Sequence, residues 1–113
     1  MEPYILFLLF VKHWYVDFVN QTNAEVQGKG IYLNHLGLYH SFKHGLSTMV
    51  ILLLDNNINQ AIILGSVDFI VHYHVDYLKM RFGNRDITNP KFWHHLGFDQ
   101  LMHYITYLLI VYV

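Results

Sequence analysis

The sequence predicts a single all-α domain over residues 1–113, a four-helix up-down transmembrane bundle. Three observations lead to this prediction: low charge, four apolar segments of about membrane-spanning length, and polar side chains confined to one half of each segment. Charged residues make up 13% of the chain and apolar residues 54%, whereas ordinary soluble domains contain roughly 25% charged residues. This composition favours a protein that lies in a membrane.

The four apolar segments are interpreted as helices over residues 3–20, 31–54, 61–80 and 91–113. Pro3 suits the start of the first helix, because the first helical position needs no backbone N–H donor. Residues 21–30 and 81–91 are polar and contain glycine, so they are interpreted as loops. Each predicted helix is close to the roughly 20 residues that cross a bilayer.

Each predicted helix is apolar in one half and polar in the other, and the order of the halves alternates along the chain. In an up-down bundle, all four polar halves therefore meet at one end. The loops at that end contain the basic residues Lys29, Arg81, Arg85 and Lys91. By the positive-inside rule this end is cytoplasmic. We expect both termini outside, with loops 21–30 and 81–91 in the cytoplasm.

Each polar half carries a pair of His or Asp side chains four residues apart. Side chains at this spacing lie one turn apart on the same face of a helix. Because the polar halves face one another, we predict that all of these side chains bind metal. They are His13, Asp17, His40, His44, His72, Asp76, Asp99 and His103. The set suits two ions better than one, since a zinc site takes about four ligands.

The ligand types narrow the choice of metal and reaction. Imidazole with carboxylate favours a divalent transition metal over calcium and magnesium, which prefer oxygen ligands. Zinc is the first expectation, with manganese or iron as alternatives. Di-iron bundles that activate dioxygen use Glu-x-x-His pairs, which the spacing here does not match. A His-rich pair of ions with Asp ligands is typical of a hydrolytic site, where the metals lower the pKa of bound water.

Four side chains are predicted to take part in catalysis: Asp17, Asp76, Lys79 and Gln100. One carboxylate acts as a base, and Lys79, Gln100 and Gln21 orient the substrate. The alternative for Lys79 is a membrane-surface anchor. Lys12 and Lys43 are expected to face away from the ligands, as anchors or as partners of Asp on adjacent helices. The alternative for the whole set is a hydrogen-bonded polar core that binds no metal.

Four motifs occur in order along most of the chain: His13-x-x-x-Asp17-Phe18-x-x-Gln21, His40-x-x-x-His44-Gly45, His72-x-x-x-Asp76-x-x-Lys79 and Phe98-Asp99-Gln100-x-x-His103. Together they resemble a family of small bacterial and phage membrane proteins, catalogued as domain of unknown function 3307. The resemblance implies a compact, often phage-encoded protein of the bacterial inner membrane, whose shared polar residues are those in the motifs.

A looser similarity to zinc-dependent phospholipases C and nucleases, which also carry His-x-x-x-Asp helices, implies phosphoester chemistry. The N-terminal Trp ligand of that superfamily is missing here. We therefore expect a metal-dependent hydrolase of a phosphoester at the inner face of the membrane, with metal ions and membrane lipid as partners. The alternatives are a metal-binding protein without catalysis and a phage-encoded membrane protein that engages a host protein or forms a homo-oligomer.

Two further classes of protein are disfavoured: nucleic-acid-binding proteins and helical bundles that lie outside the membrane. The net charge of −1 argues against nucleic acid as a partner, because there is no basic patch to neutralise phosphates. A carboxylate–histidine bundle outside the membrane would need one polar outer face along each helix. Residues 104–113 provide none, since that run contains no charged residue.

Overall fold

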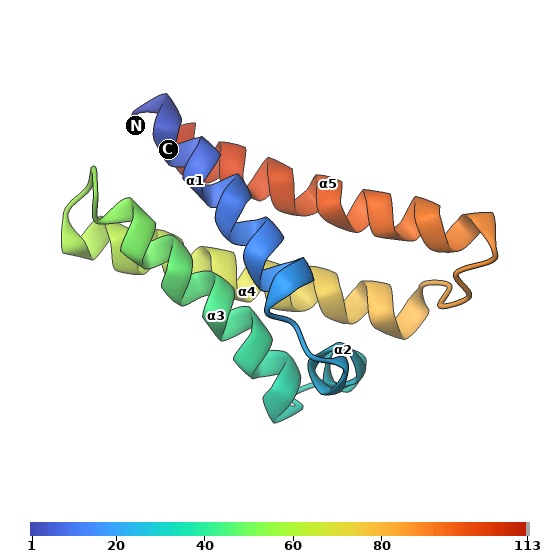
Figure 1. Cartoon of the computed structure of the whole chain (residues 1–113). Helices are drawn as coiled ribbons and strands as arrows, with labels where there is room; N and C mark the ends of the chain where they lie inside the picture. The colour runs from blue at the N-terminus through green and yellow to red at the C-terminus, as the bar shows by residue number, and fades with distance from the viewer. Residues whose placement is uncertain (113) are drawn as a thin grey trace.

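The computed structural model describes residues 1–112, an all-α chain without strands in that range. The elements are α1 (Pro3–Trp14), the π-helical turn η1 (Tyr15–Val19), α2 (Asn23–Lys29), α3 (His35–Leu52), α4 (Ile58–Phe82) and α5 (Pro90–Tyr112). Figure 1 shows that α3, α4 and α5 each run opposite to the long helix before them. Helix α2 lies crosswise beside the start of α3, and the two chain ends lie close together at the opposite end of the bundle.

None of the helices within residues 1–112 combines the length and the sustained apolar character needed to cross a membrane. The predicted four-helix transmembrane bundle, the multi-pass location in the bacterial inner membrane, and the outside termini with cytoplasmic loops at 21–30 and 81–91 are therefore wrong. The physical reason is that titratable side chains interrupt every long helix. Even α4, the longest, carries Asp68, His72 and Asp76 in succession along its buried face.

Residues 21–30 were predicted as a loop but contain α2, whose start is held by a capping box. The Thr22 hydroxyl accepts a hydrogen bond from the Glu25 backbone N–H at 3.2 Å, and the Glu25 carboxylate accepts one from the Thr22 N–H at 3.0 Å. These bonds satisfy N–H groups that a helix start otherwise leaves unpaired. The capped helix buries the side chains of Glu25 and Lys29 against the bundle.

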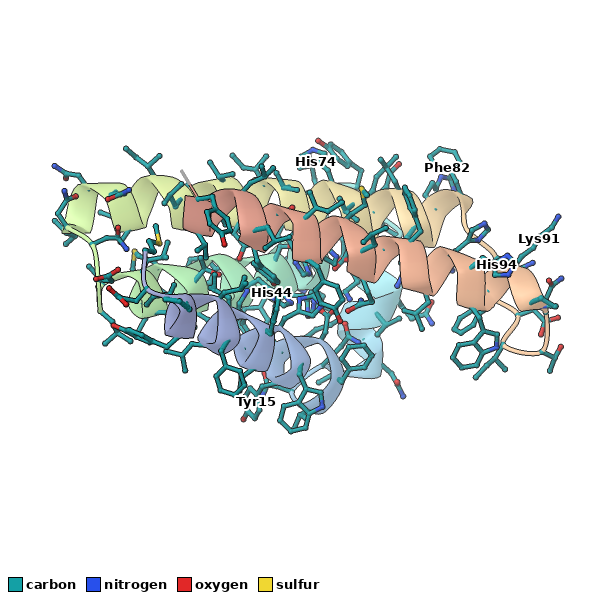
Figure 2. The ribbon with its side chains drawn as sticks, turned by 90° about the horizontal axis from the view of Figure 1, so that it is seen from above. Tyr15, His44, His74, Phe82, Lys91 and His94 are labelled. Atoms are coloured by element: carbon teal, nitrogen blue, oxygen red, sulfur yellow. The ribbon has the colours of Figure 1, made fainter. Side chains whose placement is uncertain are left out.

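The interior has an apolar part and a polar part. The apolar part joins the start of α1, the end of α3, the start of α4 and the end of α5, and consists of Ile5, Leu9, Leu52, Ala61, Leu64, Tyr107, Ile110 and Val111. The polar part contains the buried titratable side chains of Lys12, His13, Asp17, Glu25, Lys29, His40, His44, Asp68, His72, Asp76, Asp99 and His103. In Figure 2, His44 points into the bundle whereas Tyr15 and Phe82 point outward.

Helices α3 and α4 pack backbone against backbone at Gly45 and Gly65. A Cβ atom on Gly45 would lie 2.9 Å from the Gly65 carbonyl oxygen, and a Cβ atom on Gly65 would lie 2.9 Å from the Gly45 carbonyl oxygen. Only glycine fits at either position without moving a helix. The same contact brings the rings of His44 and His72 into a stack with centroids 3.6 Å apart.

Replacing Gly45 with Ala is expected to destabilise the fold by about 2 kcal/mol, because the added methyl group forces two packed backbones apart. Urea unfolding followed by circular dichroism measures this change. Gly97→Ala is the matched control: nothing lies within 4 Å of a Cβ there, so this change within α5 is expected to stabilise the protein by about 1 kcal/mol. Equal stability of Gly45→Ala and the unmodified chain would contradict the close contact.

Candidate metal centre

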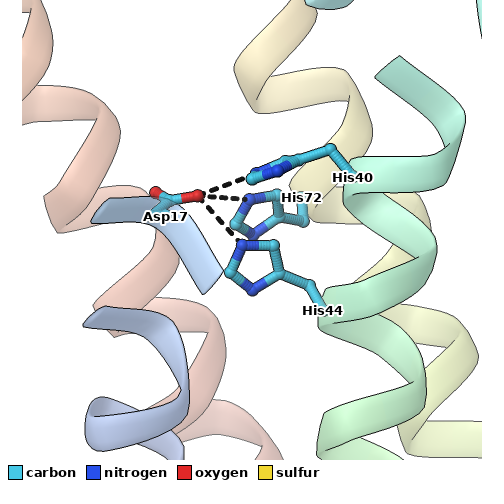
Figure 3. A group of neighbouring side chains, drawn as sticks. All are labelled: Asp17, His40, His44 and His72. Atoms are coloured by element: carbon cyan, nitrogen blue, oxygen red, sulfur yellow. Dashed lines mark hydrogen bonds and ion pairs between the residues drawn. The ribbon is translucent and has the colours of Figure 1, made fainter. Parts of the chain in front are cut away.

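The candidate metal centre lies where η1, α3 and α4 meet. Asp17, His40, His44 and His72 each offer a donor atom, and these atoms all lie within 4.8 Å of one another. Asp17 Oδ1 is 2.8 Å from His40 Nε2, 2.9 Å from His44 Nε2 and 3.6 Å from His72 Nε2. Figure 3 shows the three imidazoles directed at this carboxylate. All four side chains are buried.

Local structure explains this convergence. Asp17 lies in the middle of η1, and single π-helical turns of this kind often occur at functional sites, where they re-aim a side chain. His40 and His44 lie one turn apart on α3, so both rings face the same way. His72 reaches them from α4 across the glycine contact at Gly45, where the two helices approach closely.

A second group adjoins the first and shares His72 with it. It consists of His72, Asp76 and His103. Asp76 Oδ2 is 3.1 Å from His72 Nε2, and Asp76 Oδ1 is 3.1 Å from His103 Nε2. Asp99 Oδ1 lies 3.2 Å from the same His103 nitrogen. Six of the eight predicted ligands thus belong to the two groups, and Asp99 lies beside the second.

Several buried polar atoms near the two groups have no hydrogen-bond partner among residues 1–112. They are His40 Nδ1, both ring nitrogens of His72, Asp76 Oδ2 and Asp99 Oδ1. A buried polar group without a partner is destabilising by about 1–3 kcal/mol. An ion bound to His72 Nε2 would supply the missing partner for that nitrogen. The donor set of three imidazoles and one carboxylate also fits a zinc-type ion.

Asp17 is held as a carboxylate and His40 and His44 as neutral imidazoles, which are the forms that metal binding needs. Burial by itself raises the pKa of Asp17, but hydrogen bonds from His40 and His44 lower it well below its usual value. Burial lowers the pKa of His44 well below its usual value, and the nearby His72 and Lys12 lower it further. Burial likewise lowers the pKa of His40.

His103, in the second group, differs from these imidazoles. Burial lowers its pKa, but the neighbouring carboxylates of Asp76 and Asp99 together outweigh burial and raise the pKa to about 10. His103 is therefore an imidazolium at neutral pH, paired with two carboxylates. The two groups thus differ in charge as well as in the number of donors.

His13, a predicted ligand, lies outside both groups. Gln100 Nε2 donates to Asp99 Oδ2 at 3.0 Å, so the Gln100 oxygen faces the other way, 2.6 Å from His13 Nε2. An amide oxygen only accepts, so His13 Nε2 carries the proton. Its Nδ1 then accepts from the Tyr107 hydroxyl at 2.8 Å. Both nitrogens of His13 therefore have hydrogen-bond partners. Gln100 also lies beside Asp17, so it links His13 to that carboxylate.

Three buried or half-buried lysines pair with aspartates on other helices: Lys12 with Asp68 at 3.1 Å, Lys29 with Asp76 at 3.3 Å and Lys79 with Asp99 at 3.6 Å. Lys12 Nζ also lies 3.0 Å from His44 Nδ1. The expectation that Lys12 faces away from the ligands is therefore wrong. The side chain is long enough to reach back across α1 from a position next to His13.

Sequence reasoning missed the two side chains that α2 contributes. Glu25 Oε2 lies 3.7 Å from His40 Nδ1 and is held by Lys43, whose Nζ is 2.8 Å from Glu25 Oε1. Lys29 reaches Asp76 from the end of the same helix. The pattern Thr22-x-x-Glu25 was the available signal, because it is a capping-box sequence that marks a helix start.

Fold and site together define a small all-α protein with a buried His/Asp centre that could hold a metal ion. The chain belongs to the family described as "Protein of unknown function (DUF3307)", whose model matches residues 5–113. This match confirms the resemblance inferred from the four motifs. No curated protein and no solved structure matches the chain.

The predicted integral membrane hydrolase is wrong. No helix within residues 1–112 can cross a membrane, and the geometry of the site does not identify a hydrolytic reaction. The catalytic roles assigned to Asp17, Asp76, Lys79 and Gln100 stay predictions. What the structure does support is that buried His and Asp side chains form groups able to hold a metal ion.

Proposed function

We propose that the protein binds a divalent transition-metal ion, zinc before manganese or iron, through Asp17, His40, His44 and His72. The observation that carries this proposal is the convergence of four buried donors from η1, α3 and α4 within 4.8 Å of one another. Zinc takes four ligands of the nitrogen, sulfur and carboxylate types in a tetrahedral arrangement. Calcium and magnesium prefer sets made of oxygen alone.

The number and burial of the donors favour an ion that is part of the fold. Structural zinc sites use four protein ligands, whereas catalytic ones keep a position for water or substrate. The proposed site has four protein donors, all buried. The ion would therefore tie η1 to the α3–α4 pair, and the protein would act as a metal-binding protein without catalysis.

Residues behind the donors support the same proposal. A histidine that binds metal through one nitrogen usually donates the N–H of the other to a carboxylate or a carbonyl, which fixes the ring. His40 Nδ1 faces the Glu25 carboxylate at 3.7 Å, a separation that a small ring rotation converts into a hydrogen bond. Glu25 would then hold His40 with Nε2 directed at the ion.

A cleft between α4 and α5 leads toward the buried groups. Its volume is about 360 Å³, and its lining includes Lys79, Asp99 and the apolar side chains of Phe82 and Phe98. Asp99 contacts His103, which contacts Asp76 of the second group. An ion entering by this cleft would pass from one carboxylate to the next on its way to Asp17.

Elemental mass spectrometry of the purified chain tests the proposal. We expect bound zinc, manganese or iron in the unmodified protein and its loss in Asp17→Asn, which keeps the side-chain shape but removes the charge that three imidazoles face. Asp86→Asn is the matched control, because Asp86 is exposed in the α4–α5 connection and its metal content is expected to stay unchanged. Circular dichroism verifies that both variants remain helical.

Two results would contradict the proposal. One is an unmodified chain that stays free of metal after zinc, manganese and iron have each been offered. The other is a folded Asp17→Asn variant that retains its ion as tightly as the Asp86→Asn variant does.

A further inference from the structure

Four buried aspartates lie in or beside the polar interior, and three of them have a lysine partner. Lys12 pairs with Asp68, Lys29 with Asp76 and Lys79 with Asp99. Asp17 is the exception: within residues 1–112 it has histidines, but no lysine or arginine, within 4.0 Å. A charge buried without a counter-charge is strongly destabilising, so Asp17 is the carboxylate at which a metal cation completes the balance of charge.

The shared histidine limits how many ions the two groups can hold. A neutral imidazole nitrogen has one lone pair, so His72 Nε2 can bind one ion and not two. If His72 serves the first group, that group has four donors, and the second keeps only Asp76 and His103. The complete ligand set therefore belongs to the Asp17 group.

The second group already contains a fixed cation, the ammonium of Lys29. Its Nζ lies 3.3 Å from Asp76 Oδ2, and the side chain is 6% exposed. Lys29 also donates to the side-chain oxygen of Gln21, whose amide nitrogen donates to the Asp17 backbone oxygen at 2.8 Å. The ammonium is thus held from two sides at the carboxylate that a second ion would need.

We propose that the centre takes a single metal ion, at the Asp17 group, and that the ammonium of Lys29 stands in place of a second ion at Asp76. This inference rests on the proposed function and refines it. It replaces the expectation of two ions, which came from counting all the His and Asp side chains as ligands. Lys29 acts as a specificity-determining residue that sets the number of ions.

The test is the number of cobalt(II) or zinc ions bound per full-length chain, measured by titration with optical detection of cobalt and by elemental mass spectrometry. We expect one ion in the unmodified protein and two in Lys29→Met. The methionine keeps the length of the side chain but releases Asp76, which can then bind a second ion together with Asp99 and with His103, whose ring proton the ion displaces. Lys91→Met is the matched control, since Lys91 is exposed near the start of α5 and belongs to neither group, and it is expected to bind one ion.

A second variant tests the location without depending on the folding of Lys29→Met. Asp76→Asn is expected to keep one ion, because the Asp17 group remains intact, and Asp17→Asn is expected to lose it. Loss of the ion in a folded Asp76→Asn variant, with retention in Asp17→Asn, would overturn the assignment.

The outcomes separate this inference from the proposed function. Two ions in the unmodified protein would overturn the single-ion inference and leave the metal-binding function standing. One ion in the unmodified protein and still one in a folded Lys29→Met variant would overturn the role of Lys29. No ion in any variant would overturn the proposed function itself and this inference with it.

Discussion

Zinc at saturating concentration is expected to raise the midpoint of thermal unfolding by about 15 °C over the metal-free protein. An ion that binds only the folded chain stabilises it by about 4 kcal/mol when free zinc is about 1,000-fold above its Kd. A domain of this size shifts its midpoint by about 4 °C for each kcal/mol. Circular dichroism melts in the presence of a chelator and of zinc measure the difference.

The size of this effect follows from where the donors lie. Asp17, His40, His44 and His72 come from three separate segments, so an unfolded chain does not hold them together. Asp17→Asn should therefore melt at the same temperature with and without zinc, and calcium should not shift the melt of the unmodified chain. An equal zinc effect in Asp17→Asn would place the binding elsewhere, for instance at outward-facing histidines such as His74 and His94 (Figure 2).

Replacing Lys12 with Met is expected to destabilise the metal-free protein by about 4 kcal/mol, because it leaves a buried carboxylate without its partner. Lys12 Nζ lies 3.1 Å from Asp68 Oδ2, and the two side chains are 5% and 1% exposed. Burial raises the pKa of Asp68, but the Lys12 ammonium, together with His72 and the hydrogen bond from Thr48, holds the pKa below its usual value. Urea unfolding at neutral pH, where Asp68 is charged, measures the loss.

The double variant Lys12→Met/Asp68→Asn provides the control. It removes both charges while keeping the side chains close to their original size, so it is expected to recover more than half of the stability that Lys12→Met loses. Removing both members of a buried ion pair is often nearly neutral, whereas removing one is not. If the double variant is as unstable as the sum of the two single variants, the pair is not energetically coupled.

The sequence was sufficient to locate the long helices and the spacing of the side chains between them. The predicted helix at 91–113 corresponds to α5 (Pro90–Tyr112), and the one at 31–54 contains α3 (His35–Leu52). The spacing of four residues put His40 and His44 on one face, and the antiparallel order brought that face opposite His72. These results follow from helical periodicity, which a single sequence displays directly.

The membrane-spanning arrangement of the bundle was predicted wrongly because a high content of apolar residues was taken to indicate contact with lipid. Many large apolar side chains lie on the outside, among them Phe7, Trp14 and Phe82, while the interior is partly titratable. Amino-acid composition does not show which apolar or titratable side chains lie inside the bundle and which lie outside. The run of apolar residues that a membrane span needs is broken in each helix by buried residues such as Asp68 and His72.

The direction of Lys12 and the position of Lys29 were predicted wrongly for a different reason. Helical periodicity gives the direction of a Cβ atom, not the position of an ammonium several bonds further on. Lys12 follows Val11 and precedes His13, yet its Nζ reaches Asp68 on α4 and Tyr107 on α5. Lys29 was assigned to a loop and therefore to solvent, although α2 carries it into the interior.

Because the donors come from three separate segments, the order in which these segments pack determines how the centre assembles. Helices α3 and α4 are joined by a short turn, so they can pair early in folding, with His40, His44 and His72 already aligned. Asp17 arrives only when α1 and η1 dock across residues 20–34, a longer connection than the turn between α3 and α4, and a longer connection closes more slowly. An incomplete molecule would offer the three imidazoles without the Asp17 carboxylate, and so would retain an ion poorly. Tight retention of the ion would then distinguish finished chains from half-assembled ones.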